Sequence, residues 1–552
     1  MINHLMKTAV LTAALSLAAS GASKLSKDLE NLPPDKTTDV IVQFRQRPGE
    51  AHHRKMAAKG GQLKTRLDAM RSGLYSVPAG KLKELADDPD VAYISPDRPV
   101  QAAGGTLALD YKLQAVTADI AQTYGWNGTG IGVAIIDSGI SDKPDLHGAS
   151  GYRVVYAKNM LVAGKSAVDD YGHGSHVAGI VGGNGGQSKG VNAGVATNVN
   201  LINLKALDKT GAGTDSAVIA AIQLAVQLKS TYNIRVINLS LGRPVFESYT
   251  LDPLCQAVEA AWNAGIVVVV AAGNDGRNNS ANTSGYATIS APGNDPYVIT
   301  VGAMKTEGTS PRSDDYVASY SSKGPTLFDH VVKPDLVAPG NRVISVLGDT
   351  TLLQMALSQS YPGNISNGAY FILSGTSMAT PMVSGAAALL LQQNPNLTPD
   401  QVKARLMKTA YKAFPASSTA TDPGTGTIYT SYYDLFTIGA GYLDVWAALN
   451  NSDVLTAGTT ARSPSAVYNA STGQVTLVNG TNVVWGTNGV WGTNVVWGTN
   501  VLSAANVVWG TNVVWGTNTM QGFNVVWGTN VVWGTSSTPV TEAVSVTING
   551  EN

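Results

Sequence analysis

Five short apolar runs between residues 131 and 302 constrain the fold of this 552-residue chain more than any other feature. Each run is continuous rather than alternating in polarity, which is typical of strands buried on both faces of a parallel sheet. The runs cover 131–136, 199–207, 235–239, 266–271 and 297–302, and stretches of helical spacing cover 217–228 and 252–264, where Gly265 caps the second helix. We therefore expect residues 110–450 to form one large α/β domain built on a doubly wound parallel sheet.

A second, smaller unit is expected before this domain. Short strands are predicted over 39–44, 73–77 and 91–95, and helices over 54–71 and 79–86. Such alternation over about 60 residues is typical of a compact α+β module. The helix over 54–71 is basic and amphipathic, and we interpret its charges as a solvated face.

The first 22 residues have the pattern of an export signal peptide. Lys7 precedes an apolar run from Ala9 to Ala19, and the small residues 20–23 suit cleavage after Ala22. About eleven apolar residues are too few to span a bilayer, and no later run reaches about 18. We therefore expect a secreted protein, extracellular or associated with the cell surface, with no transmembrane segment in its mature form.

A hexad repeat, Val-Val-Trp-Gly-Thr-Asn, occupies residues 477–535, between a linker rich in small residues (451–476) and a tail (536–552). Seven tryptophans share one six-residue phase: Trp485, Trp491, Trp497, Trp509, Trp515, Trp527 and Trp533. A single strand of about 60 residues would be about 200 Å long, whereas strands rarely exceed about ten residues. The chain is therefore expected to turn at Gly-Thr-Asn and form a β-rich solenoid or hairpin array.

Composition excludes several classes of function. The formal net charge is −1, so no basic field indicates nucleic-acid binding. The single cysteine, Cys255, excludes an intrachain disulfide framework, a four-cysteine zinc site and an iron–sulfur cluster. Cys255 lies on the helix expected over 252–264, and we interpret it as an inert core residue. No glycine-rich phosphate loop follows a strand in the pattern that a nucleotide cofactor needs.

Three residue types that nucleophilic hydrolysis requires stand at strand ends or helix starts. Asp137 follows the strand over 131–136, and His173 begins the helix start His-Gly-Ser-His-Val-Ala-Gly. Ser377 lies in Gly-Thr-Ser-Met-Ala-Thr-Pro, before a helix expected to run to about residue 393. Ligands bind outside the carboxyl ends of the strands in open α/β sheets, so these positions can converge on one crevice. A serine nucleophile needs a neighbouring base. An imidazole can take its proton, and a buried carboxylate orients that imidazole.

The oxyanion of such a reaction also needs hydrogen-bond donors. Asn274, in Ala-Ala-Gly-Asn after the strand over 266–271, offers an amide, and the backbone N–H of Ser377 offers a second donor. Together, these four motifs in the chain order Asp, His, Ser resemble those of the subtilisin-like serine proteases, the subtilases, over about residues 39–450. The resemblance implies a serine endopeptidase with Asp137, His173 and Ser377 as its triad and Asn274 in its oxyanion hole.

The same resemblance implies a cleft for protein or peptide substrates. Two segments match those that pair with an extended peptide as added strands, and small residues there let the backbone approach closely. A third matches the floor of the pocket for the side chain before the scissile bond, where large apolar side chains are expected. These residues are Gly211, Ala212, Gly213, Ser240, Leu241, Gly242, Ala272 and Gly273.

The resemblance also assigns roles outside the cleft. Residues 24–100 look like the inhibitory propeptide of the family, a ferredoxin-like α+β module that acts as an intramolecular inhibitor. No cofactor is required for the chemistry. Subtilases often bind calcium in surface loops, but the loop Gly182–Gly190 carries no carboxylate, so structural calcium is left unassigned. The segment Asn341–Leu373 looks longer than in minimal relatives, and we interpret it as a rim loop.

Three further polar residues flank the predicted catalytic histidine. His176 follows His173 by three positions, but no third metal ligand is placed nearby, so we interpret His176 as a structural helix residue. Asp169 and Asp170 precede His173, and we interpret both as solvated charges, with a modest effect on substrate preference as the alternative.

Two functions from different classes follow. The favoured one is a secreted serine endopeptidase, made as a zymogen that cuts itself near 100–110. The alternative is a surface-interaction or structural protein whose tryptophan-rich repeats contact the cell envelope or partner chains. The tryptophans could instead form only the core of their own array. An added anchor is compatible with protease activity, so both functions can coexist.

Overall fold

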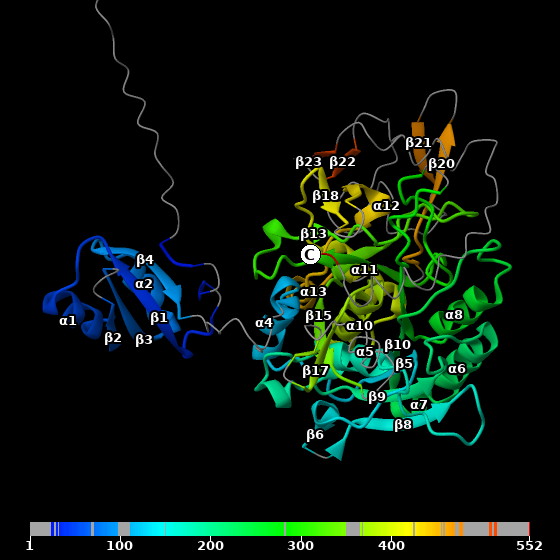
Figure 1. Ribbon diagram of the computed structural model, residues 1–552, viewed down its shortest axis with the longest axis horizontal. Coiled ribbons are helices and arrows are strands. Elements are labelled where there is room, and N and C mark those ends of the chain that lie inside the picture. Colours follow the sequence, from blue (N-terminus) through cyan, green and yellow to red (C-terminus); the bar gives the residue numbers. More distant parts are fainter. Residues whose placement is uncertain are drawn as a thin grey trace, which may run out of the picture. The chain divides into compact units, whose positions relative to one another are not determined.

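A computed structural model of the chain divides into two compact units, residues 1–103 and 104–552 (Figure 1). The signal peptide (1–22), the processing region near 100–110 and most of the repeats lie outside the residues that the structure describes. The described residues are 24–26, 29–30, 32–67, 71–97, 111–149, 151–280, 283–348, 365–366, 368–422, 426–453, 455, 459–469, 474–478, 507–509, 513–515 and 551.

The smaller unit is a four-stranded antiparallel sheet with two helices. Its elements are β1 (Thr37–Phe44), α1 (Glu50–Ala58), β2 (Gln62–Leu67), β3 (Ser72–Pro78), α2 (Leu82–Ala86) and β4 (Val91–Pro96). The strand order is β2-β3-β1-β4, which with this chain order gives the βαββαβ arrangement of ferredoxin-like folds. Alternate residues of the central strands, such as Val40, Val42, Tyr75 and Val77, are fully buried, so the unit has a core of its own.

The helix predicted over 54–71 is wrong. The helix α1 ends at Ala58, and the chain reverses through Gly60, whose φ of 86° is disfavoured for other residues. The following residues form β2, which pairs antiparallel with β3. Arg54 and Lys55 lie on α1, whereas Lys64 and Arg66 lie on the edge strand β2, where Lys64 pairs with Asp39 at 2.6 Å. The helical spacing of the charges therefore gave a wrong prediction, because Gly60 and Gly61 interrupt the helix.

The larger unit is built on an eight-stranded sheet whose central strands are buried on both faces. Six strand pairs are parallel, and β13 alone is antiparallel to its neighbour β12. The strand order is β13-β12-β11-β10-β5-β9-β8, with β14 also paired to β12. The strands are β5 (Gly132–Asp137), β8 (Val154–Asn159), β9 (Asn200–Lys205), β10 (Ile234–Leu239), β11 (Val267–Ala271), β12 (Ile299–Lys305), β13 (Tyr316–Val317) and β14 (Leu336–Pro339). All five predicted strands and the doubly wound α/β class are confirmed.

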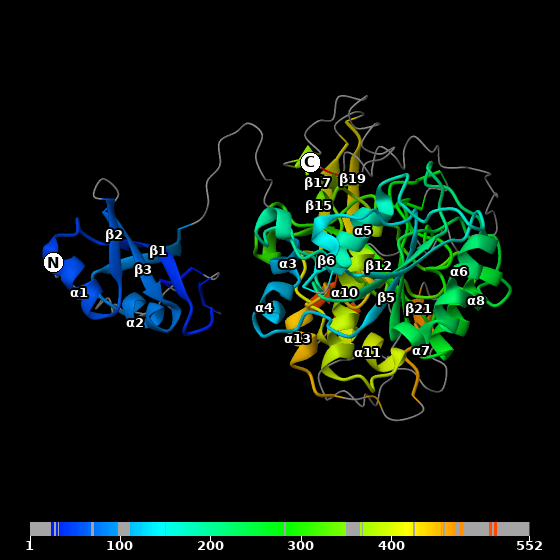
Figure 2. The same cartoon turned by 90° about the horizontal axis from the view of Figure 1, so that it is seen from below.

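Helices cover both faces of this sheet. The helices α5 (His173–Gly182) and α10 (Thr376–Gln393) pack together on one face, whereas α6 (Asp215–Gln227) and α8 (Pro253–Asn263) pack together on the other (Figures 1 and 2). The helix α10 crosses β10, β11 and β12, and α11 (Pro399–Thr409) packs beside it. Shorter helices are α3 (Lys112–Ala115), α4 (Ala118–Thr123), α7 (Lys229–Tyr232), α12 (Leu435–Ile438) and α13 (Val445–Leu449). The helices predicted over 217–228, 252–264 and 377–393 are confirmed.

Small antiparallel elements decorate the larger unit. The described parts of the predicted rim loop form the sheet of β15 (Val343–Val346), β16 (Ile365–Ser366) and β17 (Tyr370–Leu373). Four two-stranded pairs are β6 (His147–Gly148) with β7 (Gly151–Tyr152), β18 (Ser417–Thr421) with β19 (Ile428–Tyr432), β20 (Ser465–Asn469) with β21 (Gln474–Val478), and β22 (Val507–Trp509) with β23 (Val513–Trp515). The last pair comes from adjacent hexads separated by one Gly-Thr-Asn, and Val508 lies opposite Val514.

Part of the predicted linker packs against the larger unit. Ser463 donates through its hydroxyl to Asp335 at 2.5 Å and through its backbone N–H to the carbonyl of Pro296 at 2.9 Å. Lys403 also donates to the Ser463 hydroxyl, at 2.9 Å. Within the described ranges, none of the helices combines the length and apolar character that crossing a membrane would require.

Candidate active site

The carboxyl edge of the sheet gathers the predicted site residues. Asp137 is the last residue of β5, and Ser240 follows directly after β10, the neighbouring strand. Ile135 pairs with Asn238, so the same register brings Asp137 and Ser240 level with one another. Asn274 follows β11 on the far side of β10. Parallel strands thus deliver side chains that are distant in sequence to one edge.

Asp137 and His173 form a hydrogen-bonded pair. His173 Nδ1 lies 2.8 Å from Oδ1 and 3.0 Å from Oδ2 of Asp137, and both residues are buried. The approach depends on glycines, because a Cβ on Gly174 would overlap the carbonyl oxygen of Gly139. Gly139 itself has a φ of 113°, which favours glycine. The motifs Asp-Ser-Gly and His-Gly therefore pack directly against one another.

The charge of Asp137 controls the protonation of His173. Burial alone would lower the pKa of the imidazole, but the charge of Asp137 and its hydrogen bond outweigh burial and leave the pKa above its ordinary value. Asp169 adds a smaller contribution of the same sign. An imidazole in this setting is a strengthened base, and its protonated form is stabilised.

The prediction that Asp169 is a solvated charge is wrong. The residue is 2% exposed, and its carboxylate accepts four hydrogen bonds, which satisfy a charge that would otherwise be costly to bury. Three donors are the backbone N–H groups of Tyr171, Gly172 and Ser175, at 3.0, 2.7 and 2.8 Å. The fourth is the Ser138 hydroxyl, at 2.9 Å. An acidic residue just before a helix start was the available signal, because carboxylates stabilise helix N-termini.

Asp170 differs from its neighbour and agrees with the prediction. Its side chain is 61% exposed and lies 3.1 Å from the ammonium group of Lys205. The two adjacent aspartates therefore have opposite environments, which their shared sequence context did not distinguish.

Ser377 lies at the start of α10 and is more exposed than the residues on either side of it. Thr376 and Met378 are fully buried, whereas Ser377 is partly exposed. The Ser377 hydroxyl donates to the carbonyl of Ser240 at 3.1 Å, and the Ser240 hydroxyl donates to the carbonyl of Ser377 at 2.8 Å. Among the hydrogen bonds of the described residues, none joins Ser377 to His173. Catalytic hydrogen bonds are often loose in substrate-free proteins and tighten when substrate binds.

Asn274 is oriented by the same helix start. Its Oδ1 accepts from the backbone N–H of Thr376 at 2.9 Å and from the Thr376 hydroxyl at 3.1 Å. With the oxygen bound in this way, the Nδ2 group of the planar amide remains as the donor. The backbone N–H of Ser377 is a second donor, because the first N–H groups of a helix have no partner within the helix. Thr376 was not singled out from the sequence.

The predicted substrate segments flank these groups. Ser240, Leu241 and Gly242 follow β10, and Gly242 is exposed. Gly211, Ala212 and Gly213 lie between β9 and α6. Gly211 packs closely on the ring of Tyr171, two residues before His173 in the sequence, because a Cβ on Gly211 would lie 2.6 Å from that ring. Ala272 and Gly273 follow β11, and Gly273 donates to the Thr376 hydroxyl at 3.2 Å.

His176 and Cys255 are buried and separate from the predicted chemistry. The Nε2 atom of His176 donates to the carbonyls of Val343 and Phe371, at 3.1 and 2.9 Å. Burial lowers its pKa to about 3, so the ring is neutral. Burial raises the pKa of the Cys255 thiol, which donates to Asn294 at 3.3 Å. Both residues are therefore part of the buried interior, as the interpretations of a structural histidine and a core cysteine expected.

The loop Gly182–Gly190 offers no carboxylate to a calcium ion, and structural calcium stays unassigned. Both oxygens of the nearby Asp145 already accept hydrogen bonds, from the Gln187 N–H at 2.9 Å and from the Tyr370 hydroxyl at 2.5 Å. Over the described part of the chain, no three His, Cys, Asp or Glu residues gather in the way a metal ion requires.

Comparison with known proteins adds a family relationship. Residues 128–441 match the model of the subtilase family of peptidases. Serine protease AprX of Bacillus subtilis is 42% identical over 281 residues, which cover 50% of this chain and 60% of that protease. Subtilisin E of Bacillus subtilis is 33% identical over 410 residues, covering 73% of this chain and 91% of the relative. An extracellular serine proteinase of Thermus sp. is 36% identical over 344 residues, covering 61% and 70%.

Proposed function

The chain belongs to the subtilase family and is a serine-type endopeptidase, and we propose that it cleaves peptide bonds with Asp137, His173 and Ser377 as its catalytic triad. The observation that carries the proposal is the hydrogen-bonded pair of Asp137 and His173 at the edge of the sheet where α10 presents the Ser377 hydroxyl. Subtilases need no cofactor for catalysis.

In the proposed reaction, the Ser377 hydroxyl turns from the Ser240 carbonyl toward His173. Its Oγ attacks the scissile carbonyl carbon while His173 Nε2 takes the proton, and Asp137 stabilises the resulting imidazolium through Nδ1–H. The tetrahedral intermediate then collapses, the C–N bond breaks, and the imidazolium returns the proton to the leaving amine. A water molecule hydrolyses the acyl-enzyme by the same route.

Two donors are proposed to hold the oxyanion of the tetrahedral intermediate. They are Asn274 Nδ2, oriented by the hydrogen bonds that Thr376 donates to Oδ1, and the backbone N–H of Ser377. The dipole of α10 adds positive potential at this end of the helix.

An extended peptide is the proposed substrate. Residues 211–213 and 240–242 would pair with its backbone as added strands, since both segments contain exposed residues: Ala212, Gly213 and Gly242. Ala272 and Gly273 would form the floor of the pocket for the side chain before the scissile bond.

Labelling of the active serine tests this assignment. The full-length chain is incubated with casein, with and without a serine-directed phosphonate, and the labelled peptide is identified by mass spectrometry. We expect the label on Ser377, loss of caseinolysis on labelling, and neither label nor activity in Ser377→Ala. A label on another serine would refute the assignment.

We further propose that the enzyme is secreted as a zymogen. Residues 1–22 would direct export, and residues 24–100 would inhibit the cleft until cut near 100–110. The separate core of the smaller unit supports a role as an independent module. Purified Ser377→Ala should keep residues 24–100 attached, whereas the wild-type chain should release them. Trimming of pure Ser377→Ala at that junction would refute self-processing.

The repeats are proposed as an additional contact with the cell envelope or with partner chains. Exposed aromatic rows are typical of interaction surfaces. Solvent quenching of tryptophan fluorescence in a 470–552 fragment distinguishes this role from a buried core: strong quenching is expected for an exposed row. Weak quenching would leave the tryptophans as the core of their own array.

A further inference from the structure

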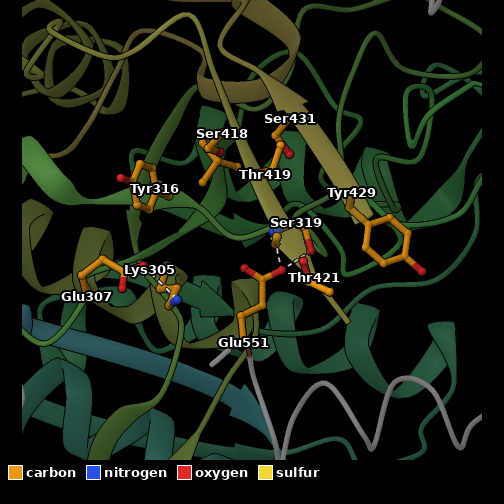
Figure 3. A pocket seen from close by; sticks show the side chains of 12 residues that line it. Lys305, Glu307, Tyr316, Ser319, Ser418, Thr419, Thr421, Tyr429, Ser431 and Glu551 are labelled. Carbon is orange, nitrogen blue, oxygen red and sulfur yellow. Dashed lines mark hydrogen bonds and ion pairs between the residues drawn. The ribbon is translucent and has the colours of Figure 1, made fainter. Parts of the chain in front are cut away.

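Glu551, in the tail of the chain, is buried against the larger unit. Only 5% of its surface is exposed, and it lies at a polar pocket of about 350 Å³ (Figure 3). The hairpin of β18 and β19 forms one wall of this pocket, and the end of β12 with β13 forms another. The site is distinct from the groups assigned above to peptide-bond cleavage.

The side chain of Glu551 is bound as a carboxylate. Its Oε1 accepts from Arg277 Nη2 at 2.8 Å and from the backbone N–H of Ser319 at 2.7 Å, and it also accepts from the Ser319 hydroxyl. Hydrogen bonds between an ionised donor and an ionised acceptor are about twice as strong as neutral ones. Three converging donors therefore favour an acidic side chain.

The backbone of Glu551 is bound as well. Asn341 Nδ2 donates to the Glu551 carbonyl at 2.9 Å, and Asn341 Oδ1 accepts from the Glu551 N–H at 2.7 Å. One amide side chain thus satisfies both backbone groups, as a neighbouring strand would in peptide recognition. The combination selects an acidic residue within a peptide segment rather than a free anion.

Arg277 is held in place by groups other than Glu551. Its Nε donates to the Ser319 hydroxyl at 2.7 Å, its Nη1 lies 3.2 Å from Asp422, and its guanidinium lies 5.0 Å from the centre of the Tyr429 ring. These contacts orient the guanidinium before any carboxylate arrives. The site is therefore preorganised, which reduces the entropy lost when a segment binds.

The site is connected to the loops of the oxyanion hole. Arg277 follows Asn274 by three positions. The segment 319–322 is hydrogen-bonded to the loop that contains Asn274 and Arg277. The Gly276 N–H donates to the Tyr320 carbonyl at 2.8 Å, and the Ser322 N–H donates to the Gly273 carbonyl at 3.0 Å. Asn341 follows Gly340, whose carbonyl accepts from the N–H of Gly375 at 2.8 Å, two residues before Ser377. Glu551 thus joins the three segments that surround Asn274.

We propose that Arg277, Ser319 and Asn341 form a docking site for an acidic residue of a peptide segment, and that the tail carrying Glu551 is its ligand. The docked tail braces the loops on which Asn274 and Ser377 lie. The residues that bind Glu551, namely Arg277, Ser319 and Asn341, precede it by 274, 232 and 210 positions in the sequence.

Hydrogen–deuterium exchange of the full-length chain tests the proposal. All variants carry Ser377→Ala, so self-digestion does not interfere and the readout is independent of the proposed catalysis. Glu551→Ala should raise exchange about tenfold or more in peptides covering 273–278 and 318–322, as loss of a charge-assisted hydrogen bond predicts. The matched control Glu542→Ala, at the other glutamate of the tail, should change neither.

A second arm adds a synthetic peptide with the sequence of residues 546–552 to the Glu551→Ala chain. This peptide should restore the protection of both segments, and a peptide with glutamine at the position of Glu551 should not. Unchanged exchange in Glu551→Ala, an equal effect of Glu542→Ala, or equal rescue by the glutamine peptide would each overturn the proposal.

Discussion

The buried carboxylate of Asp169 accepts a hydrogen bond from the hydroxyl of Ser138 at 2.9 Å, and this bond joins the two motifs that supply Asp137 and His173. The Ser138 hydroxyl in turn accepts from the N–H of Gly174 at 2.9 Å, and the Ser138 N–H donates to Asp137 at 2.7 Å. Asp169 therefore acts on the proposed triad through its neighbours, as a positioning residue.

Asp169→Asn should impair both stability and turnover. Asparagine retains one acceptor oxygen but presents an amide group to the N–H of Ser175, so we expect a loss of about 1.5–3 kcal/mol of unfolding free energy. A displaced imidazole should lower kcat about 10- to 100-fold. Removing the negative charge also lowers the pKa of His173, so the acid limb of kcat/KM should move to lower pH.

Asp170→Asn is the matched control for this substitution. Its exposed side chain should leave stability within about 0.5 kcal/mol of the wild type. Urea unfolding and the pH profile measure both effects. An unchanged kcat in Asp169→Asn would contradict the positioning role, even if stability fell, and an unshifted acid limb would contradict the charge effect on His173.

Gly174→Ala should abolish activity. The added methyl group would overlap the Gly139 carbonyl and separate α5 from the end of β5. For the unfolding of the uncleaved chain, Gly49→Ala is the control, because no atom lies within 4 Å of its Cβ position and its φ of −111° suits any residue. Peptide hydrolysis and thermal unfolding are the measurements. If Gly174→Ala kept more than about a tenth of wild-type kcat, the activation free energy would have risen by less than about 1.4 kcal/mol. Such a result would contradict the tight packing of the two motifs.

Asn274→Ala should lower kcat about 10²- to 10³-fold with little change in KM, because the lost donor acts on the developing oxyanion. Thr376→Val removes one of the two hydrogen bonds to Asn274 Oδ1 and should have a smaller effect of the same kind. Steady-state kinetics on a peptide substrate separates kcat from KM. A large rise in KM at constant kcat would instead indicate a role in ground-state binding.

The acid limb of kcat/KM should have a midpoint above 6.5. The imidazole of His173 must be neutral to take the serine proton, and its pKa lies above 6.5 because Asp137 outweighs burial. Activity is therefore complete above this raised pKa and falls as pH falls through it. A pH series with an uncharged peptide substrate measures the midpoint. A value below 6.5 would show that the imidazolium is not stabilised as the structure indicates.

His176 should make the fold sensitive to acid. Its pKa is about 3 in the folded chain, lowered by burial from 6.5, so between these values the unfolded chain binds a proton that the folded chain does not. Stability should fall as pH falls through this window, by up to about 1.4 kcal/mol per pH unit from this group. Urea unfolding at pH 7 and pH 4.5 should show a smaller pH dependence for His176→Leu. An equal slope in both proteins would contradict this assignment.

Many strands and helices of the larger unit could be predicted, because the burial pattern of each is visible within a short segment of the sequence. Continuous apolar runs such as that of β11 are stable only when both faces are covered, so they predict a parallel sheet flanked by helices. The four motif residues could be proposed because the chemistry needs those residue types at strand ends and helix starts, and their roles stay predictions. Thr376 could not, since its role depends on where Asn274 lies.

The failures share a physical cause. The segment over 54–71 has charges at helical spacing, but Gly60 and the pairing of β2 with β3 decide its structure. Asp169 and Asp170 are identical in type and adjacent in sequence, and Asp169 is the one on which donors from Ser138 and the start of α5 converge.

The sequence by itself determined the sheet, the helices that cover it and the residue types of the proposed triad, because burial patterns and reactive groups are properties of short segments. Only the tertiary structure decided which carboxylates are enclosed. Burial of a charge is favourable only where donors converge from several segments, as on Asp169 from Ser138 and α5, and on Glu551 from Arg277 and Ser319. Such convergence is set by the folded chain, since no local pattern encodes contacts across more than 200 positions.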